Sequence, residues 1–271
     1  MSILANRIYY VNSENRVSGT SSNFKYQLDI PDEARFDSVC VRSMIIPNSY
    51  YLVREGQNKF AVELDGVRTD LVVKKGNYSV RNFPPVILEL LDSVEPPVEE
   101  DGELNSVWSM EYDSVTGKFA YSYTGVASSV QLKFEKPTNL GNQFGFDEIS
   151  VNSFVDGKLE SANVVDFVST STLFLHSDMV QDQSSILQEL YSDNTVPFSN
   201  HVYNCKYPMM YSKTLQNGKS GVFNFSLCDE HNLEVDLNGH EFLFTLLLYR
   251  KENLSETMKK VLQIMVNMKD E

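Results

Sequence analysis

Residues 21–53 read SSNFKYQLDIPDEARFDSVCVRSMIIPNSYYLV and hold the clearest fold signal in the chain. Between Phe24 and Ile30 apolar and polar residues alternate, so one face of an extended segment is apolar and the other is polar. Pro31 ends that segment, and a largely apolar, β-branched run follows at 39–46 before Pro47. The stretch therefore predicts two consecutive β-strands.

Short strands of the same kind are predicted along most of the chain. Turn pairs such as Asp65-Gly66, Lys75-Gly76 and Thr116-Gly117 separate them. The further predicted strands are 60–64, 70–74, 107–112, 119–124, 130–134, 173–176, 222–227 and 241–249. Strands this short, interrupted this regularly, indicate an all-β sandwich or barrel.

Helical signals are fewer. Residues 80–91 fit a helix that starts at Pro84-Pro85, and 184–190 fit one helical turn. The strongest signal is a C-terminal amphipathic helix at 253–269, which Asn253 and Glu256 can cap together. Its apolar face at helical spacing contains Leu254, Met258, Val261, Leu262, Met265 and Val266.

The domain organisation predicted from the sequence is a single domain over residues 1–271, because there is no internal repeat and no sharp shift in composition. Residues 1–22 are rich in Asn and Ser, which favours a flexible N-terminal arm. Residues 92–105 carry six acids, two prolines and no base, and are expected to form an exposed loop.

Composition limits the classes of partner. The 23 Lys and Arg are outnumbered by 37 Asp and Glu, giving a net charge of −14, and the longest basic runs are pairs. Nucleic-acid binding needs clustered cations, so it is disfavoured. No apolar run reaches the roughly 18–20 residues that span a bilayer, and no secretory signal is visible, so synthesis in the cytoplasm is expected. Cys40, Cys205 and Cys228 form no metal-binding or disulfide pattern and are expected to be small buried apolar residues.

The sequence contains no clear motif of a catalytic or metal-binding site. No HxH, HExxH, GxSxG, P-loop or GxGxxG pattern occurs. His176, Ser177 and Asp178 are adjacent, but neighbouring strand residues face opposite sides, so they cannot form a triad together. We therefore predict no enzyme, no catalytic residue, no metal and no cofactor. Convergent carboxylates of a glycosidase or lyase stay open as an alternative, because sequence does not show which acids meet.

Several stretches, in order, resemble the single jelly-roll minor capsid proteins of virophages, polinton-like viruses and related large double-stranded DNA viruses. Residues 21–53 resemble the family's opening strand pair, and KGNYSV (75–80) resembles its turn before a helix. NQFGF (142–146), TLFLHSDMVQD (172–182) and 222–251 resemble three later elements. The C-terminal helix has no clear counterpart.

This resemblance implies a single jelly-roll fold and the role of a penton, the protein at the five-fold vertices of an icosahedral capsid. The implied partners are four further copies in a homopentamer and the major capsid protein of the surrounding capsomers. The implied location is the virion, after synthesis in the host cytoplasm or viral factory. Met258, Leu262 and Met265 form a candidate subunit interface, with packing on the chain's own sheet as the alternative. A host-attachment or carbohydrate-binding jelly roll, which would be trimeric, also stays open.

Overall fold

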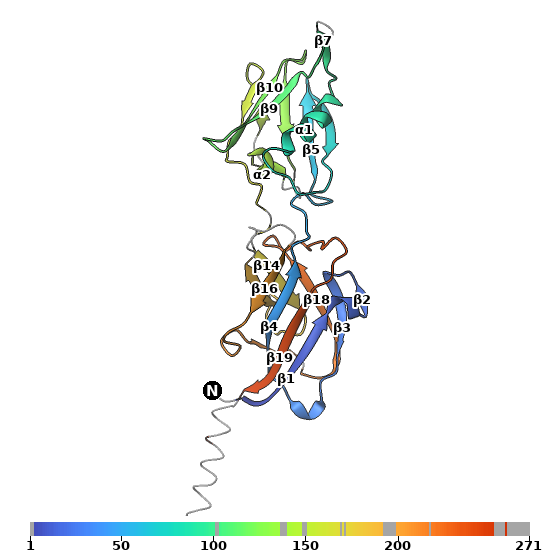
Figure 1. The fold of residues 1–271 in the computed structure, drawn as a ribbon, viewed down its shortest axis with the longest axis vertical. Coiled ribbons are helices and arrows are strands. Elements are labelled where there is room, and N and C mark those ends of the chain that lie inside the picture. The colour runs from blue at the N-terminus through green and yellow to red at the C-terminus, as the bar shows by residue number, and fades with distance from the viewer. Residues whose placement is uncertain are drawn as a thin grey trace, which may run out of the picture. The chain divides into compact units, whose positions relative to one another are not determined.

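The computed structural model describes residues 3–100, 103–135, 140–147, 151–168, 170, 172–191, 199–216, 218–251 and 258. The chain divides into two compact units, shown in Figure 1: unit 1 combines residues 1–50 with 170–271, and unit 2 is formed by residues 51–169. This differs from the single domain expected from the sequence. The reason is that both units consist of short alternating strands, so composition does not change where one gives way to the other.

Unit 1 consists of two antiparallel sheets. The first has the order β1-β19-β4-β16, with the short β17 also paired to β4, and the second has the order β15-β14-β18-β3-β2. The strands of the first sheet are β1 (Ile3–Asn12), β4 (Ser38–Pro47), β16 (Asn200–Asn204), β17 (Lys213–Thr214) and β19 (Leu243–Lys251). Those of the second are β2 (Ser18–Gly19), β3 (Asn23–Leu28), β14 (Thr172–Ser177), β15 (Ile186–Tyr191) and β18 (Gly221–Cys228).

The strand order of unit 1 is that of a jelly roll. Leaving aside the short β2 and β17, the chain order of its described strands is β1, β3, β4, β14, β15, β16, β18, β19. The first, eighth, third and sixth of these form one sheet, and the second, seventh, fourth and fifth form the other. The predicted all-β jelly-roll class is therefore confirmed. Unit 2 is inserted in the chain between the third and fourth strands, β4 and β14.

The core of unit 1 lies between its two sheets and is built from the alternation read in the sequence. Phe24 and Leu28 on β3 are buried, whereas Lys25 between them is exposed. The ring of Phe225 on β18 lies 5.8 Å from that of Phe24 and 5.1 Å from that of Phe244 in the opposite sheet, measured between centroids. Aromatic side chains thus join the two sheets.

The N-terminal segment is not a flexible arm. Residues 3–12 form β1, which pairs with β19 along its length, and Val11 is buried in the core. A 3-10 turn, η1 (Ser13–Asn15), follows it. The prediction was wrong because β1 is an edge strand whose partner is more than 200 residues away, so its many polar side chains remain on the surface.

A small polar network anchors the end of β1. The buried Ser13 donates its hydroxyl to one carboxylate oxygen of Glu241, and Arg16 Nη1 donates to the other at 2.8 Å. The same Arg16 nitrogen also donates to the Ser13 carbonyl at 2.7 Å. Burial raises the pKa of Glu241, but the hydrogen bonds from Ser13 and Arg16 outweigh it and hold the pKa below its ordinary value.

Glu241→Gln is expected to lower the free energy of unfolding by about 1 kcal/mol near neutral pH, because it removes one charge-assisted interaction of a group about one-third exposed. A carboxylate with a lowered pKa stabilises the fold above its unfolded pKa, and that stabilisation is lost as pH falls through the folded pKa. The difference in free energy of unfolding between wild type and the Glu241→Gln variant should therefore shrink as the pH falls toward about 3. Urea titrations near pH 7 and at about pH 3 measure this difference. An equal difference at both pH values would show that the Glu241 carboxylate is not responsible for it.

Unit 2 is a second, smaller arrangement of strands with two helices. Its sheets have the orders β12-β11-β5-β6, β13-β10-β9 and β7-β8. The strands are β5 (Lys59–Leu64), β6 (Val67–Val72), β7 (Val98–Glu100), β8 (Glu103–Asn105), β9 (Trp108–Asp113), β10 (Lys118–Tyr123), β11 (Val130–Lys133), β12 (Asn152–Ser153) and β13 (Lys158–Glu160). The helices are α1 (Phe83–Asp92) and α2 (Leu140–Phe144), and α1 confirms the helix predicted at 80–91.

The core of unit 2 is a cluster of aromatic side chains centred on α2. The ring of Phe144 lies 5.0 Å from Phe60 of β5, 5.2 Å from Phe83 of α1 and 6.3 Å from Tyr121 of β10. The Tyr121 hydroxyl donates to the Phe144 carbonyl at 2.7 Å. Phe144 thus contacts the sheet that contains β5, the sheet that contains β10, and helix α1.

Two further expectations can be compared with the structure, and a third falls almost entirely outside the described residues. Residues 184–190 are not a helical turn, because 186–191 form β15. Residues 92–105 are exposed in part, as predicted, yet 98–100 and 103–105 pair as the β7–β8 hairpin. Of the predicted C-terminal helix at 253–269, only Met258 belongs to the described residues. No described helix has both the length and the apolar character needed to cross a membrane.

Candidate functional site

Unit 1 has an open groove of about 800 Å³, called here the β15–β16 groove. It is lined by residues 186–191 of β15 and by residues 203–207 and 210–213. Both flanking strands stand at the end of their sheets in the described strand order. Edge strands carry backbone groups that no neighbouring strand has paired, so this side of unit 1 is suited to a partner.

One wall of the groove is a loop that leaves the sheet edge. Asn204 of β16 pairs with Ser43 of β4, and Lys213 of β17 pairs with Val39 of the same strand. The 205–212 loop (CKYPMMYS) therefore occupies the space opposite only three residues of β4. Its proline has no N–H to give to a sheet, which favours this departure from the strand.

The 205–212 loop presents large apolar side chains to solvent. Met210 is 78% exposed, and Tyr207, Met209 and Tyr211 are also exposed. Tyr191, on the opposite wall of the groove, is 74% exposed. Clustered exposed aromatic and Met side chains are typical of interaction surfaces, because Met adapts its shape and Tyr combines an apolar ring with a polar tip.

Tyr203 and Cys205 contribute uncharged side chains to the lining of the groove. Tyr203 and Cys205 are half-buried there, and the Cys205 backbone N–H donates to the Arg42 carbonyl at 2.8 Å. Burial, together with a side-chain hydrogen bond with Cys205, raises the pKa of the Tyr203 hydroxyl. Burial likewise raises the pKa of the nearby Cys40 thiol to about 12, with a contribution from Cys205. At neutral pH the Tyr203 and Cys40 groups are therefore protonated and uncharged.

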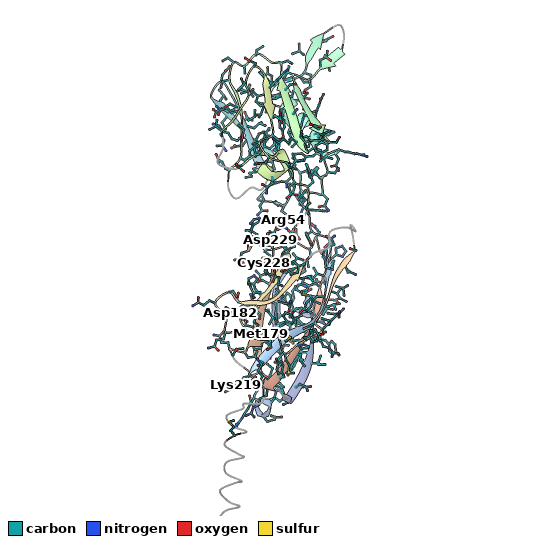
Figure 2. All side chains as sticks on the ribbon, turned by 90° about the vertical axis from the view of Figure 1, so that its left-hand side faces the viewer. Arg54, Met179, Asp182, Lys219, Cys228 and Asp229 are labelled. Carbon is teal, nitrogen blue, oxygen red and sulfur yellow. The ribbon has the colours of Figure 1, made fainter. Side chains whose placement is uncertain are left out.

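Three charged side chains line the groove: Glu189 from β15, Lys206 from the 205–212 loop, and Lys213 from β17. Lys213 Nζ lies 3.7 Å from the Asp182 carboxylate, and both side chains are exposed enough for water to weaken the pair. Figure 2 labels Asp182 at the periphery of unit 1 and Met179 further inside, in agreement with the burial of Met179.

A second hollow, of about 430 Å³, adjoins the groove on the first sheet. It is lined by Tyr10, Arg42, Ser43, Asn204, Cys205 and Thr245. Asn204 and Cys205 belong to both hollows. Tyr10 of β1 is 77% exposed, but Arg42, Ser43, Asn204 and Thr245 make the lining of this second hollow mainly polar.

The structure does not bring His176, Ser177 and Asp178 together. His176 Nδ1 lies 3.0 Å from the Ser185 hydroxyl, whereas the buried Ser177 hydroxyl accepts from the Met179 N–H at 3.2 Å. Asp178 is exposed and accepts from the Asn224 N–H at 2.9 Å. Each side chain therefore has its own local partner. Among the described residues, no three His, Cys, Asp or Glu side chains gather in a way that could hold a metal ion.

Of the predicted interface residues, only Met258 is among the described residues, and it does not line the groove. Met258 is 61% exposed, and Leu262 and Met265 lie outside the described residues. Cys40 and Cys228 are buried as expected, but Cys205 is only half-buried because it lines the groove. The groove was not predicted. The run YPMMY at 207–211, two Tyr and two Met around a proline, was the available signal for its exposed wall.

No protein-family model matches the sequence, and no curated protein sequence matches it. Among solved structures, the chain is similar to the crystal structure of the selenomethionine-labelled mavirus penton protein. The two share 10% identity with a TM-score of 0.48, over 90% of this chain and 99% of that chain. The class defined by the strand order itself is a single jelly roll with a second unit inserted between its third and fourth strands.

Proposed function

We propose that this chain is a structural capsid protein, a penton that forms homopentamers at the five-fold vertices of an icosahedral virion. The observation that carries the proposal is the complete jelly-roll strand order of unit 1. The ordered sequence motifs that resemble single jelly-roll minor capsid proteins support it independently. Fold alone does not fix function, so the proposal depends on both.

A ring of five identical subunits requires two different surfaces that fit each other, because each subunit meets its neighbours through opposite sides. Unit 1 offers such a pair. One side carries the free edge of β1, where the Tyr26 hydroxyl of β3 donates to the Tyr10 carbonyl at 3.4 Å. The other side carries the β15–β16 groove and the 205–212 loop. An obligate contact of this kind buries roughly 2,000 Å² or more.

The proposal includes the partners and location that follow from a vertex role. The surrounding neighbours would be copies of the major capsid protein, and the chain would be made in the host cytoplasm or viral factory. With a net charge of −14, the penton would close the shell without binding the genome. A DNA-binding titration at two salt concentrations tests this part, and tight, salt-dependent binding would contradict it.

Electron microscopy of the purified protein at high concentration tests the ring directly. Closed rings with five-fold symmetry are the expected result. Closed three-fold particles would contradict the vertex role and favour the attachment or carbohydrate-binding alternative, for which a glycan array is the matching assay. A variant with Met210→Glu and Tyr211→Glu should lose the rings while retaining its circular dichroism spectrum, because both side chains are exposed in the isolated chain.

A further inference from the structure

Two strands of unit 1, β1 and β15, have an edge to which a further strand can be added. We propose that, in the ring, β1 of one copy pairs with β15 of the next copy, alongside the β15–β16 groove. This inference rests on the proposed function, because it names the surface of the neighbouring copy that the groove receives. The first sheet of each copy would then continue into the second sheet of its neighbour.

The sheet edges of unit 1 differ in how well they are protected against a further strand. The described strand order ends in β1 and β16 in the first sheet and in β15 and β2 in the second. β2 has only two residues, and the 205–212 loop, with one proline and one lysine, interrupts the edge along β16 and β17. Short strands, prolines and lysines are common means of blocking an edge. β1 and β15 contain neither proline nor lysine, and their pairing is irregular only near their first residues.

Backbone hydrogen bonds show which groups of β15 point away from its sheet. The Ser177 N–H of β14 donates at 2.8 Å to the carbonyl of the residue that precedes β15, so every second residue of β14 counted back from Ser177 bonds to β15. The partners of those residues in β15 are Gln188 and Leu190. Glu189 and Tyr191 alternate with them and therefore turn their N–H and carbonyl groups outward. In agreement, the Gln188 side chain donates to the Glu189 carbonyl at 2.6 Å.

The same alternation identifies the outward groups of β1. The Ser13 N–H donates at 3.0 Å to the carbonyl of the residue that precedes β19, so every second residue of β1 counted back from Ser13 bonds to β19. Asn6, Ile8 and Tyr10 lie between those residues and turn their backbone groups away from β19. In agreement, the Tyr10 carbonyl accepts from the Tyr26 hydroxyl of β3 at 3.4 Å. No described strand lies next to either of the two edges.

The two edges fit each other in length, spacing and charge. β15 has six residues, which extend about 20 Å, and β1 has ten, so β1 can pair along the whole of β15. Outward groups recur at every second residue on both edges, which is the spacing that an antiparallel ladder joins. The one charged residue of β15 is Glu189, and the one charged residue of β1 is Arg7, of opposite sign.

The partner of β15 has to be a second copy. β16 borders the groove and stands at the opposite end of its sheet from β1, so β1 does not meet β15 within one chain. Pairing of β15 with β15 would join two copies symmetrically and stop there. Pairing of β1 with β15 repeats from copy to copy and can close into a ring. The exposed Tyr207 and Met210 would then pack beside the added strand.

Cross-linking between two cysteine variants tests this pairing. Tyr10→Cys and Tyr191→Cys, both at exposed positions, are each combined with Cys205→Ser, and the buried Cys40 and Cys228 are kept. A bis-maleimide about 13 Å long, the length of four strand residues, forms one thioether with each introduced thiol. An equal mixture of the two variants should give at least about tenfold more two-chain product than either variant alone, because pairing holds the two thiols at a high local concentration.

Val126→Cys is the matched control for random collision, because Val126 is 97% exposed in unit 2 and belongs to neither edge. Mixed with Tyr10→Cys, it should give only the background amount. No product from Tyr10→Cys with Tyr191→Cys at any concentration would overturn the pairing, as would product from Tyr191→Cys alone. Five-chain species without the product would overturn the pairing and leave the vertex role standing. The product in a closed species of three chains would support the pairing and overturn the vertex role.

Glu189→Pro tests whether backbone groups make the contact. Proline is tolerated at an edge position whose N–H points away from the sheet, so the variant should fold, but it has no N–H to donate to β1 of a neighbour. The concentration needed for half-assembly should rise at least about tenfold. Glu189→Gln keeps the N–H and removes only an exposed charge, so it should change that concentration less than about threefold. Equal effects of the two variants would overturn the pairing.

Hydrogen exchange keeps the test decisive if the proline variant does not fold. In the assembled wild-type protein the N–H groups of Glu189 and Tyr191 should exchange at least about tenfold more slowly than in the dilute single chain. Those of Gln188 and Leu190 already bond to β14 and should be slow in both samples. Unchanged exchange at Glu189 and Tyr191 on assembly would overturn the pairing.

Discussion

Gly145→Ala is expected to destabilise unit 2 by about 3 kcal/mol. Gly145 follows α2 with a φ of +79°, a conformation that residues with a Cβ rarely adopt. An added Cβ would also lie 2.6 Å from the Asn163 carbonyl oxygen and 2.7 Å from the Ser161 Cβ. The main chain cannot move aside easily, because the Asn163 N–H donates to the Gly145 carbonyl at 2.9 Å.

Gly66→Ala is the matched control for this variant. Gly66 has a similar φ of +82°, but an added Cβ would meet nothing within 4 Å. Its cost is expected to be about 1 kcal/mol, from backbone strain alone. Denaturant titration with hydrogen exchange resolved by residue measures both changes. Equal losses of stability in the two variants would contradict this prediction, because they would show that the close contacts around Gly145 add nothing to the cost of the added Cβ.

Phe225→Ala is expected to destabilise unit 1 by about 3–5 kcal/mol. Phe225 is fully buried, and its ring contacts Phe24 in its own sheet and Phe244 in the opposite sheet. Removing it leaves a cavity between the two sheets that the neighbouring strands cannot fill without moving. Since the two units have separate cores, hydrogen exchange should accelerate in unit 1 and stay unchanged in unit 2.

Val222→Ala on the same strand is the control, because Val222 is 49% exposed. Its effect should stay within about 0.5 kcal/mol. Accelerated exchange throughout residues 51–169 in the Phe225→Ala variant would contradict the description of two independent cores.

The parts of the fold that the sequence predicted are those in which local pattern and burial agree. β3 and β4 were predicted because alternation and β-branched residues coincide with burial on one or both faces. α1 was predicted because its prolines stand at the helix start, where a missing N–H costs nothing. Both predictions rest on local sequence alone and do not depend on which distant strand each segment contacts.

The parts that sequence could not predict depend on distant pairing. β1 has a polar, exposed face, and only its pairing with β19 makes it a strand. In β15, Ile186, Leu187 and Leu190 mimic helical spacing, although register with β14 makes the segment extended. The groove also escaped prediction, because it forms only where β15 and the 205–212 loop approach each other in space.

The mass of the purified full-length protein in solution tests the central claim most directly. Light scattering over a concentration series gives that mass without reference to shape. The account predicts a closed species of five chains of 30.9 kDa, about 155 kDa, that does not grow further at higher concentration. A stable trimer or dimer, or a chain that stays monomeric at the highest concentration reached, would contradict it.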